Sequence, residues 1–294
     1  MAPGSDRFTA HRAALFAPSL VICSAIMQYV GASFAVQLFA IASAGAVAWG
    51  RFSIAGIILA AIRRPKIAWR APRKAFEQLR YPVVFGLALT SMNVVFYYAI
   101  SHVHLGTAVS LEFLGPVVLA AVTGVSWRER IGVLFALVGV LSISWIGVDL
   151  SDPSQRLGVS LSLLAGLFWA LYIWFGRKVS TEASGPDALA IGFCAGGVAY
   201  LPFAIHGFGP ILASPRTMLM MLAVSVLSSL LPFLLDVAVF SRVRPSTYSL
   251  ISSLFPATSM LVGLVMLHQQ PNLGGLLGLA CVTIAVALAS KSSQ

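Results

Sequence analysis

The sequence predicts an all-α membrane protein of ten transmembrane helices, arranged as two five-helix repeats of opposite orientation. Three observations lead to this fold class. Hydrophobic residues make up 59% of the 294 residues and charged residues only 10%, too few to cover the surface of a soluble domain of this size. Apolar segments long enough to cross a bilayer recur along the whole chain, and one of them reappears 140 residues later.

Ten such apolar segments are separated by short breaks that carry proline, glycine or charge, as at Arg64–Pro65 and Gln270–Pro271. The first follows a few basic residues but continues to about Phe39, which is too long for a secretory signal, so we expect it to be retained as a span. The segments cover residues 14–36, 42–62, 81–101, 104–124, 131–148, 158–176, 186–206, 217–240, 246–267 and 272–290.

Lys and Arg are distributed unevenly between the two sides of these segments. Sixteen lie at the termini or in the loops after even-numbered spans, whereas only Arg156 and Arg216 lie in the opposite loops and Arg51 lies within a span. Because cytoplasmic loops carry the excess of positive charge, we expect a multi-pass protein of the cytoplasmic (inner) membrane with both termini in the cytoplasm. The sixteen are Arg7, Arg12, Arg63, Arg64, Lys66, Arg70, Arg73, Lys74, Arg80, Arg128, Arg130, Arg177, Lys178, Arg242, Arg244 and Lys291.

The internal repeat aligns residues 102–116, HVHLGTAVSLEFLGP, with residues 242–256, RVRPSTYSLISSLFP, without a gap. Thr107 aligns with Thr247 and Pro116 with Pro256. Five spans per half is an odd number, so the second half enters the membrane in the opposite orientation, a design typical of secondary carriers. We therefore expect two units, residues 1–150 and residues 151–294.

Glu112 is the strongest candidate for a functional residue. It lies about eight residues into an apolar segment, and a carboxylate at that depth costs at least ~2.5–3.5 kcal/mol, so it should face the interior of the bundle. It can bind a cationic group of a substrate or exchange a proton as access alternates. The alternative is a structural carboxyl group satisfied by neighbouring hydroxyl groups or by Arg51.

Two further charges lie within apolar segments. Arg51 is expected to pair with Glu112 and set its charge state, or else to meet a substrate carboxylate. Asp236 lies five residues before Ser241, close to the cytoplasmic end of its span, and we expect it either to act in gating or simply to be solvated at the interface.

A set of polar and aromatic side chains on several spans is expected to line a central cavity for a small solute. Each alone can equally stabilise contacts between helices. The prolines Pro116 and Pro256 are expected to kink or break their helices at this depth and thereby to take part in gating. The predicted cavity residues besides Glu112 and Arg51 are Gln28, Asn93, Tyr97, Trp169, Tyr172 and Ser252.

Several motifs resemble the drug/metabolite transporter superfamily, in particular its EamA-type permeases. The run Leu111-Glu112-Phe113-x-Gly115-Pro116, together with Met92-Asn93 and Trp169-Ala170-x-Tyr172, is similar to the threonine/homoserine exporter branch. The resemblance extends over nearly the whole chain and implies a permease that exports a small amino acid or a related metabolite.

Two departures from that branch bear on the substrate. Exporters of the branch usually carry an acid just before the ninth-span proline, where this chain has Phe255-Pro256, and they tend to have Gly-Glu at the end of that span, where it has His268-Gln269. The alternative therefore stays open that the chain is a carrier of the same fold for a nucleoside, nucleotide sugar, aromatic metabolite or drug.

Other classes of function are not expected. The chain has no Walker motif and no HExxH or GxSxG pattern, so neither ATP-driven pumping nor intramembrane catalysis is predicted. The three cysteines show no CxxC spacing, and no cofactor or metal is expected. The net charge of +10 is explained by topology, so no nucleic-acid partner is expected. The expected partners are a small-molecule substrate and membrane lipid, while proton coupling and a homodimer stay open.

Overall fold

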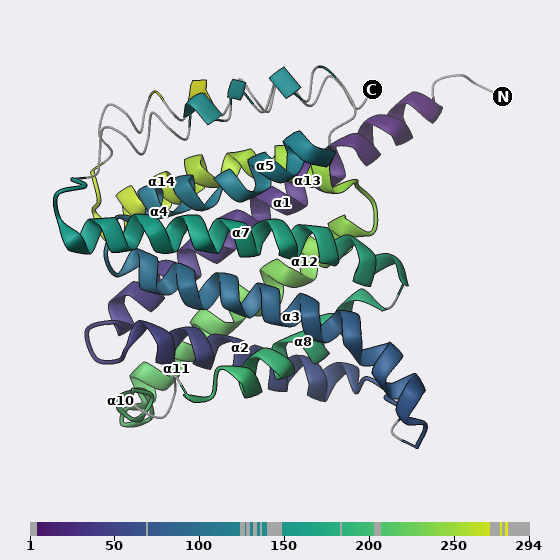
Figure 1. Cartoon of the computed structure of the whole chain (residues 1–294), viewed down its shortest axis with the longest axis horizontal. Coiled ribbons are helices and arrows are strands. Elements are labelled where there is room, and N and C mark those ends of the chain that lie inside the picture. Colours follow the sequence, from purple (N-terminus) through teal and green to yellow (C-terminus); the bar gives the residue numbers. More distant parts are fainter. Residues whose placement is uncertain are drawn as a thin grey trace.

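We describe the fold from a computed structural model of the chain. It describes residues 5–68, 70–123, 127, 130–131, 134–135, 137–139, 149–182, 184–202, 207–270, 277 and 280–281. Over these residues the chain is a bundle of helices without any strand (Figure 1). The predicted spans 131–148 and 272–290 fall largely outside the described residues.

The first half of the chain forms three long helices followed by two short ones. Ser43 caps the second helix, since its hydroxyl oxygen accepts a hydrogen bond from the Ala46 amide at 3.2 Å. The same helix ends at Arg63, and the next residue, Arg64, adopts the left-handed conformation with φ of 47° and donates its amide hydrogen to the Ala60 carbonyl. The helices are α1 (Ser5–Leu38), α2 (Ala44–Arg63), α3 (Pro72–Ile100), α4 (Leu105–Glu112) and α5 (Leu114–Thr123).

The second half begins with one long helix and continues with shorter helical pieces. Several of these pieces follow one another without a loop, so that together they make up longer, interrupted spans. The elements are α7 (Pro153–Glu182), α8 (Gly185–Ala199), α10 (Gly209–Leu212), α11 (Pro215–Ser225), the π-helical turn η1 (Val226–Leu230), α12 (Leu231–Phe240), α13 (Pro245–Ile251), the 3-10 turn η2 (Ser252–Leu254) and α14 (Phe255–Leu267).

The predicted spans agree with the helices in position. Within the described residues, six helical stretches are long and apolar enough to cross a membrane, and α8 and α14 are shorter apolar helices. The protein is therefore a multi-pass, all-α membrane protein. The helices within residues 104–124 and 246–267 are interrupted close to Pro116 and Pro256, as expected, and the span 217–240 contains a further interruption that the sequence analysis did not predict.

Prolines explain where the interruptions fall. A proline has no amide hydrogen for the carbonyl group four residues earlier and its ring clashes with that carbonyl, so the helix is disturbed there. Pro116 lies four residues after Glu112, the last residue of α4. Pro256 lies four residues after Ser252, the first residue of η2. Pro232 lies four residues after Ser228, within η1.

Glycines allow the helices to approach closely. A Cβ atom added to Gly86 on α3 would collide with the backbone of Gly192 on α8, and one added to Gly115 on α5 would collide with the backbone of Gly166 on α7. Hydrophobic burial does not drive helices together inside a bilayer, so close backbone contact of this kind is an important source of stability. These two crossings tie the first half of the chain to the second.

The helices that contain the two aligned segments, residues 102–116 and 242–256, pack against each other. Helix α4, in the first half of one segment, contacts α14, which begins at the end of the other, and α5 contacts α13 in the same way. The two segments therefore lie antiparallel. At the start of α4, the Gln269 side-chain oxygen accepts a hydrogen bond from the Leu105 amide at 3.3 Å, which satisfies a helix-terminal donor.

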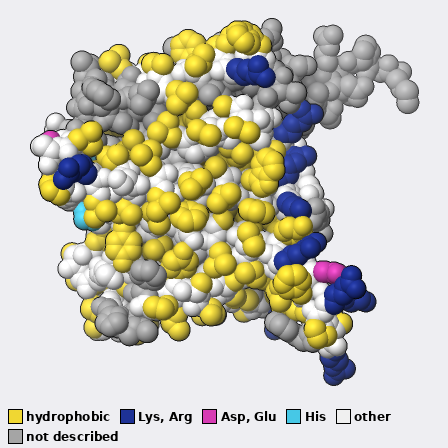
Figure 2. Space-filling model, in the orientation of Figure 1, with side chains coloured by type: hydrophobic (Ala, Val, Ile, Leu, Met, Phe, Trp, Pro, Cys, Tyr) yellow, Lys and Arg dark blue, Asp and Glu magenta, His cyan; other side chains and the backbone are white. Residues whose placement is uncertain are grey.

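The surface matches a protein surrounded by lipid. Figure 2 shows a broad hydrophobic face, with Lys and Arg gathered mainly along one edge. In Figure 1 this edge is the end of the bundle where α2 ends, α3 begins and α7 ends. Such a distribution places the basic side chains beside one membrane surface and leaves the lipid-facing sides apolar.

Candidate functional site

A small cavity lies at the centre of the bundle, lined by side chains from both halves of the chain. The volume that the centre of a water molecule can occupy in it is about 30 Å³. This is enough space for roughly two waters. Its walls combine three charged side chains with amide and aromatic groups. The lining residues are Gln28, Tyr29, Ala32, Arg51, Met92, Asn93, Phe96, Glu112, Trp169, Tyr172, Phe233, Asp236 and Phe255.

Glu112 reaches this cavity from the last turn of α4, next to the helix break at Phe113. The residue is only 5% exposed. Its carboxylate makes no hydrogen bond or ion pair with any residue that the structure describes. A buried carboxylate normally has a partner, so the absence of one among the described residues distinguishes Glu112 from the other charged side chains of the cavity.

Arg51 is held in place by the interrupted helix opposite. Its Nε donates a hydrogen bond to the Ser229 hydroxyl at 2.7 Å, and its Nη2 donates to the Ser228 backbone carbonyl. Pro232 explains why that carbonyl is available, since the residue four positions later offers it no amide hydrogen. The π-helical turn thus supplies the acceptors that fix the guanidinium.

Aromatic rings cover the Arg51 guanidinium. Its central carbon lies 4.8 Å from the ring centroid of Phe52 and 4.8 Å from that of Tyr97. The Tyr97 hydroxyl in turn lies 3.3 Å from the Ser228 hydroxyl. Stacking and hydrogen bonding together hold the cation rigidly at the cavity wall.

The expected pairing of Arg51 with Glu112 is not observed as a direct contact. Neither side chain takes part in an ion pair within 4.0 Å among the described residues, although both line the same cavity and interact electrostatically. The physical reason is that Arg51 is already bound elsewhere, by the Ser228 backbone carbonyl that Pro232 leaves free and by the Ser229 hydroxyl. The cavity therefore presents a cation and an anion that do not neutralise each other by contact.

Asp236 is buried rather than solvated at the membrane surface, with only 1% of the residue exposed. Its Oδ1 accepts a hydrogen bond from the Ser24 hydroxyl at 2.9 Å, and its Oδ2 accepts one from the Tyr172 hydroxyl at 3.3 Å. The buried Tyr248 hydroxyl, which has no hydrogen-bond partner among the described residues, also lies within electrostatic reach. Hydroxyl groups surround this carboxylate.

Gln28 and Asn93 add amide groups to the wall. The Gln28 side-chain nitrogen donates to the Ser24 hydroxyl at 3.1 Å, and the Asn93 side-chain nitrogen donates to the Leu89 carbonyl at 2.8 Å. Both amide oxygens make no hydrogen bond with a described residue. Each can therefore accept a hydrogen bond from a bound molecule.

Aromatic rings form the wall beside Glu112. The Trp169 ring lies 5.3 Å from that of Phe255 and 6.0 Å from that of Phe113, measured between centroids. Phe255 also contacts Tyr29 edge-on at 6.0 Å. Phe255 is the residue just before Pro256, so the side chain at that position of the sequence lines the cavity directly.

Of the predicted site residues, seven line the cavity and four do not. Gln28, Arg51, Asn93, Glu112, Trp169, Tyr172 and Asp236 come together from α1, α2, α3, α4, α7 and α12. Tyr97 lies behind Arg51, and Ser252 donates to its own helix at the Tyr248 carbonyl, 2.8 Å away. Pro116 and Pro256 are buried at the two helix interruptions.

Sequence reasoning missed several residues of the site. Tyr29, Met92, Phe96 and Phe233 line the cavity but resemble ordinary core residues in the sequence. Ser24 and Ser228 bind the charged side chains of the cavity: the Ser24 hydroxyl donates to Asp236, and the Ser228 carbonyl accepts from Arg51. For two of them the sequence offered an indication, because Tyr29 directly follows Gln28 and Met92 directly precedes Asn93, and both of these neighbours were predicted to line the cavity.

A multi-pass helical bundle with a charged cavity at its centre has the architecture of a membrane carrier for a small solute. Comparison with known proteins agrees. Residues 156–291 match the family model described as the EamA-like transporter family. A threonine/homoserine exporter RhtA of Salmonella typhimurium strain LT2 is 34% identical over 291 residues, covering 98% of this chain and 94% of the relative.

Other relatives extend the comparison. A threonine/homoserine exporter RhtA of Escherichia coli strain K12 is 33% identical over 256 residues, covering 87% of this chain and 84% of the relative. A solved crystal structure covers 92% of this chain and 96% of its own, with a TM-score of 0.66 and 16% identity, and so shares the fold. The chain belongs to the EamA-like transporter family, close to the threonine/homoserine exporters. It is a transporter and not an enzyme.

Proposed function

We propose that this protein is a secondary transporter of the inner membrane that exports a small amino acid, threonine, homoserine or a close relative. The identity of 34% to a threonine/homoserine exporter extends over 98% of the chain and supports this substrate class. Export rather than import follows from the relatives' function. The same assignment includes both termini in the cytoplasm, which the gathering of Lys and Arg at one end of the bundle supports (Figure 2).

The observation that carries the proposal is the unpartnered Glu112 carboxylate in the cavity that Arg51 also lines. An amino acid carries an ammonium group and a carboxylate, so it can satisfy both charges at once. We assign the ammonium group to Glu112 and the carboxylate to Arg51, which donates two hydrogen bonds to Ser228 and Ser229 and has further N–H groups to offer. A zwitterion bound in this way brings no net charge into the membrane.

The amide oxygens of Gln28 and Asn93 can bind a polar side chain of the substrate. Threonine and homoserine each carry a hydroxyl group that can donate to the side-chain oxygen of Gln28 or Asn93. An unsatisfied polar group in a buried site costs about 1–3 kcal/mol, so these amides favour a substrate with a hydroxyl group over a purely aliphatic one. The proposal thus assigns each polar group of the substrate a partner.

Transport by alternating access would widen this cavity. Its open volume of about 30 Å³ holds roughly two waters, so an amino acid requires the walls to move apart. The proposed moving units are the two five-helix repeats, residues 1–150 and residues 151–294. The packing supports this division. If the two halves are equivalent, α12 corresponds to α3 and α1 corresponds to α7, and α12 contacts α1 just as α3 contacts α7. Pro116, Pro256 and Asp236 are proposed to act in gating.

Aromatic side chains in the cavity favour a second candidate within the same fold. Phe255 packs against Trp169 and Tyr29, and this wall would stack well against an aromatic amino acid or a related metabolite. In that case the ammonium group still meets Glu112. The aromatic wall then replaces the amides as the part of the site that selects the side chain.

Counterflow in proteoliposomes tests both candidates. Vesicles containing the purified protein are loaded with unlabelled threonine or homoserine, and uptake of the labelled amino acid is measured. We expect uptake with threonine or homoserine and at most weak competition by phenylalanine and tryptophan. Preference for the aromatic amino acids would establish the second candidate, and transport of neither group would refute an amino-acid carrier.

A further inference from the structure

A second cavity lies at the basic end of the bundle, away from the central one. Its volume is about 520 Å³, and it is enclosed by the connection after α2, the start of α3, the end of α7 and the start of α8. Four of its lining side chains are cations that come from three separate parts of the chain. They are Lys66, Lys74, Arg80 and Lys178.

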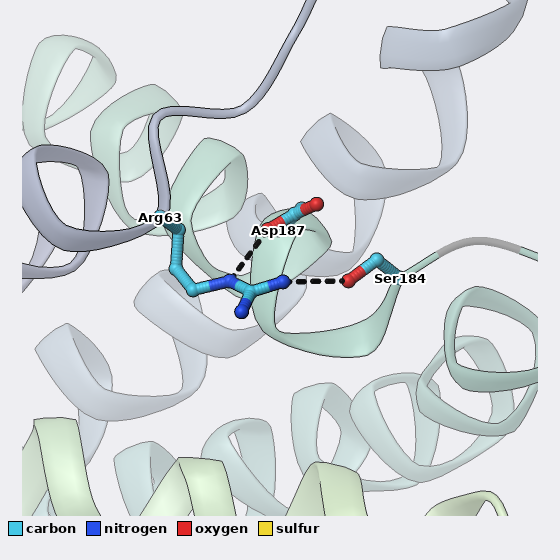
Figure 3. Close-up of polar contacts among 3 residues, drawn as sticks. All are labelled: Arg63, Ser184 and Asp187. Carbon is cyan, nitrogen blue, oxygen red and sulfur yellow. Dashed lines mark hydrogen bonds and ion pairs between the residues drawn. The ribbon is translucent and has the colours of Figure 1, made fainter.

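The two acids that also line this cavity are already paired with arginines that do not line it. The Arg63 Nε lies 2.7 Å from an Asp187 carboxylate oxygen, and the Arg63 Nη2 donates to the Ser184 hydroxyl at 3.3 Å (Figure 3). The Arg73 Nε lies 3.4 Å from a Glu77 carboxylate oxygen. Within the described residues, the four cations have no acidic partner of their own.

An aromatic ring holds two of these cations close together. The Lys178 Nζ lies 4.1 Å from the centroid of the Tyr81 ring, and the Arg80 guanidinium carbon lies 4.5 Å from the same centroid. Lys178 belongs to α7 and Arg80 to α3, so like charges on different helices are brought together around one ring. Like charges repel, and an anion between them would relieve that repulsion.

The cavity lies next to surface that faces lipid. Val84, four residues after Arg80 on the same face of α3, is 42% exposed, and Phe76 at the start of that helix is 67% exposed. Ile62 at the end of α2 is 70% exposed. A molecule with an anionic head and an apolar tail can therefore place its head among the cations and its tail along α3.

We propose that this cavity binds the phosphate headgroup of an anionic phospholipid of the membrane that surrounds the protein. A polar cavity with uncompensated positive charge, beside exposed apolar side chains at the basic end of the bundle, matches such a lipid in charge and in shape. The site rests on observations independent of the transported substrate. A lipid bound here contacts α3, α7 and α8 together and so joins the two halves of the chain.

The test compares two fourfold variants that change the net charge equally. The first replaces Lys66, Lys74, Arg80 and Lys178 with Gln. The control replaces exposed arginines that do not line the cavity, Arg70, Arg156, Arg216 and Arg244, with Gln. Binding of phosphatidylglycerol to the detergent-purified proteins is measured by native mass spectrometry, and thermal melting is measured in vesicles of phosphatidylcholine with and without phosphatidylglycerol.

We expect phosphatidylglycerol to bind wild type and the control variant and to raise their melting temperatures. The first variant should lose at least ~10-fold in affinity for this lipid, because each basic residue near an anionic headgroup contributes to binding. Equal binding by the two variants would overturn the site. A first variant that does not fold is replaced by the single change Lys178→Gln, which removes the cation on Tyr81 from the second half of the chain.

Inorganic phosphate and glycerol 3-phosphate distinguish a lipid from a soluble anion. Each is added to the wild-type protein in phosphatidylcholine vesicles, where we expect no comparable rise in melting temperature. A rise equal to that given by phosphatidylglycerol, absent in the first variant, would show a site for a soluble phosphate compound and would overturn the assignment to lipid.

Discussion

Replacing Glu112 with Gln is the most direct test of how the central cavity binds substrate. The amide has nearly the shape of the carboxylate but no charge. Because the Glu112 carboxylate makes no hydrogen bond or ion pair with a described residue, the change breaks no observed contact within the protein. Any loss of transport therefore reports on a group that enters the cavity.

The size of the effect follows from the interaction that is removed. A hydrogen bond to a charged group contributes about 1.5–3 kcal/mol, and each 1.4 kcal/mol changes an equilibrium constant tenfold. Loss of the contact between the Glu112 carboxylate and the substrate ammonium group should thus weaken threonine or homoserine binding by roughly 10- to 150-fold. The stability of the empty protein should change little, because removing a buried charge is favourable whereas losing its electrostatic attraction to Arg51 is unfavourable.

The assay measures the concentration dependence of counterflow in proteoliposomes together with thermal melting of the same preparation. Glu77→Gln serves as a control for the chemical change, because Glu77 lies outside the central cavity and its exposed ion pair with Arg73 contributes little to stability. We expect transport by this control to equal that of wild type. Two results would refute the reasoning. One is counterflow by Glu112→Gln equal to that of wild type. The other is a clear fall in the melting temperature of Glu112→Gln, which would show that the lost transport reflects a destabilised protein.

Three further changes test the surroundings of the cavity. Arg51→Lys should lower stability by about 1–3 kcal/mol in a chemical unfolding titration, because an ammonium group does not reproduce the two-pronged contact with the π-helical turn; unchanged stability would show that this contact is unimportant. Asp236→Asn should lower the melting temperature, in contrast to Glu112→Gln, since the carboxylate accepts two hydrogen bonds from buried hydroxyl groups; equal melting of the two variants would contradict the distinction. Gly86→Ala should destabilise the protein by at least ~1–3 kcal/mol through collision of α3 with α8, whereas Gly106→Ala, whose new Cβ would have its nearest neighbour 3.6 Å away, should melt like wild type.

Much of the site was predictable because a charge in an apolar span is costly in any membrane fold. Glu112, Arg51 and Asp236 stand out for that reason alone, and all three line the central cavity. The spans were predictable on similar grounds, since their length is set by the thickness of the bilayer. The roles of the charged residues in substrate binding and gating stay predictions.

The partners of these charges were not predictable from the sequence. Arg51 binds Ser228 and Ser229, which lie on an interrupted helix far along the chain. Asp236 is joined to Ser24 and Tyr172 from two other helices. Such contacts depend on which faces of the helices meet, and apolar spans show little periodicity that would reveal their inward face.

Composition and charge distribution thus determined, by themselves, that this chain is a multi-pass helical membrane protein and which of its residues must be buried at a cost. Those properties follow from the solvent, because a bilayer penalises charge and requires long apolar helices whatever their arrangement. Only the tertiary structure decided that Glu112 and Arg51 share a cavity without pairing, that Phe255 lines it, and that four cations line a second cavity at the basic end. These features depend on close helix crossings and on carbonyl groups freed by proline, which bring together residues from distant parts of the chain.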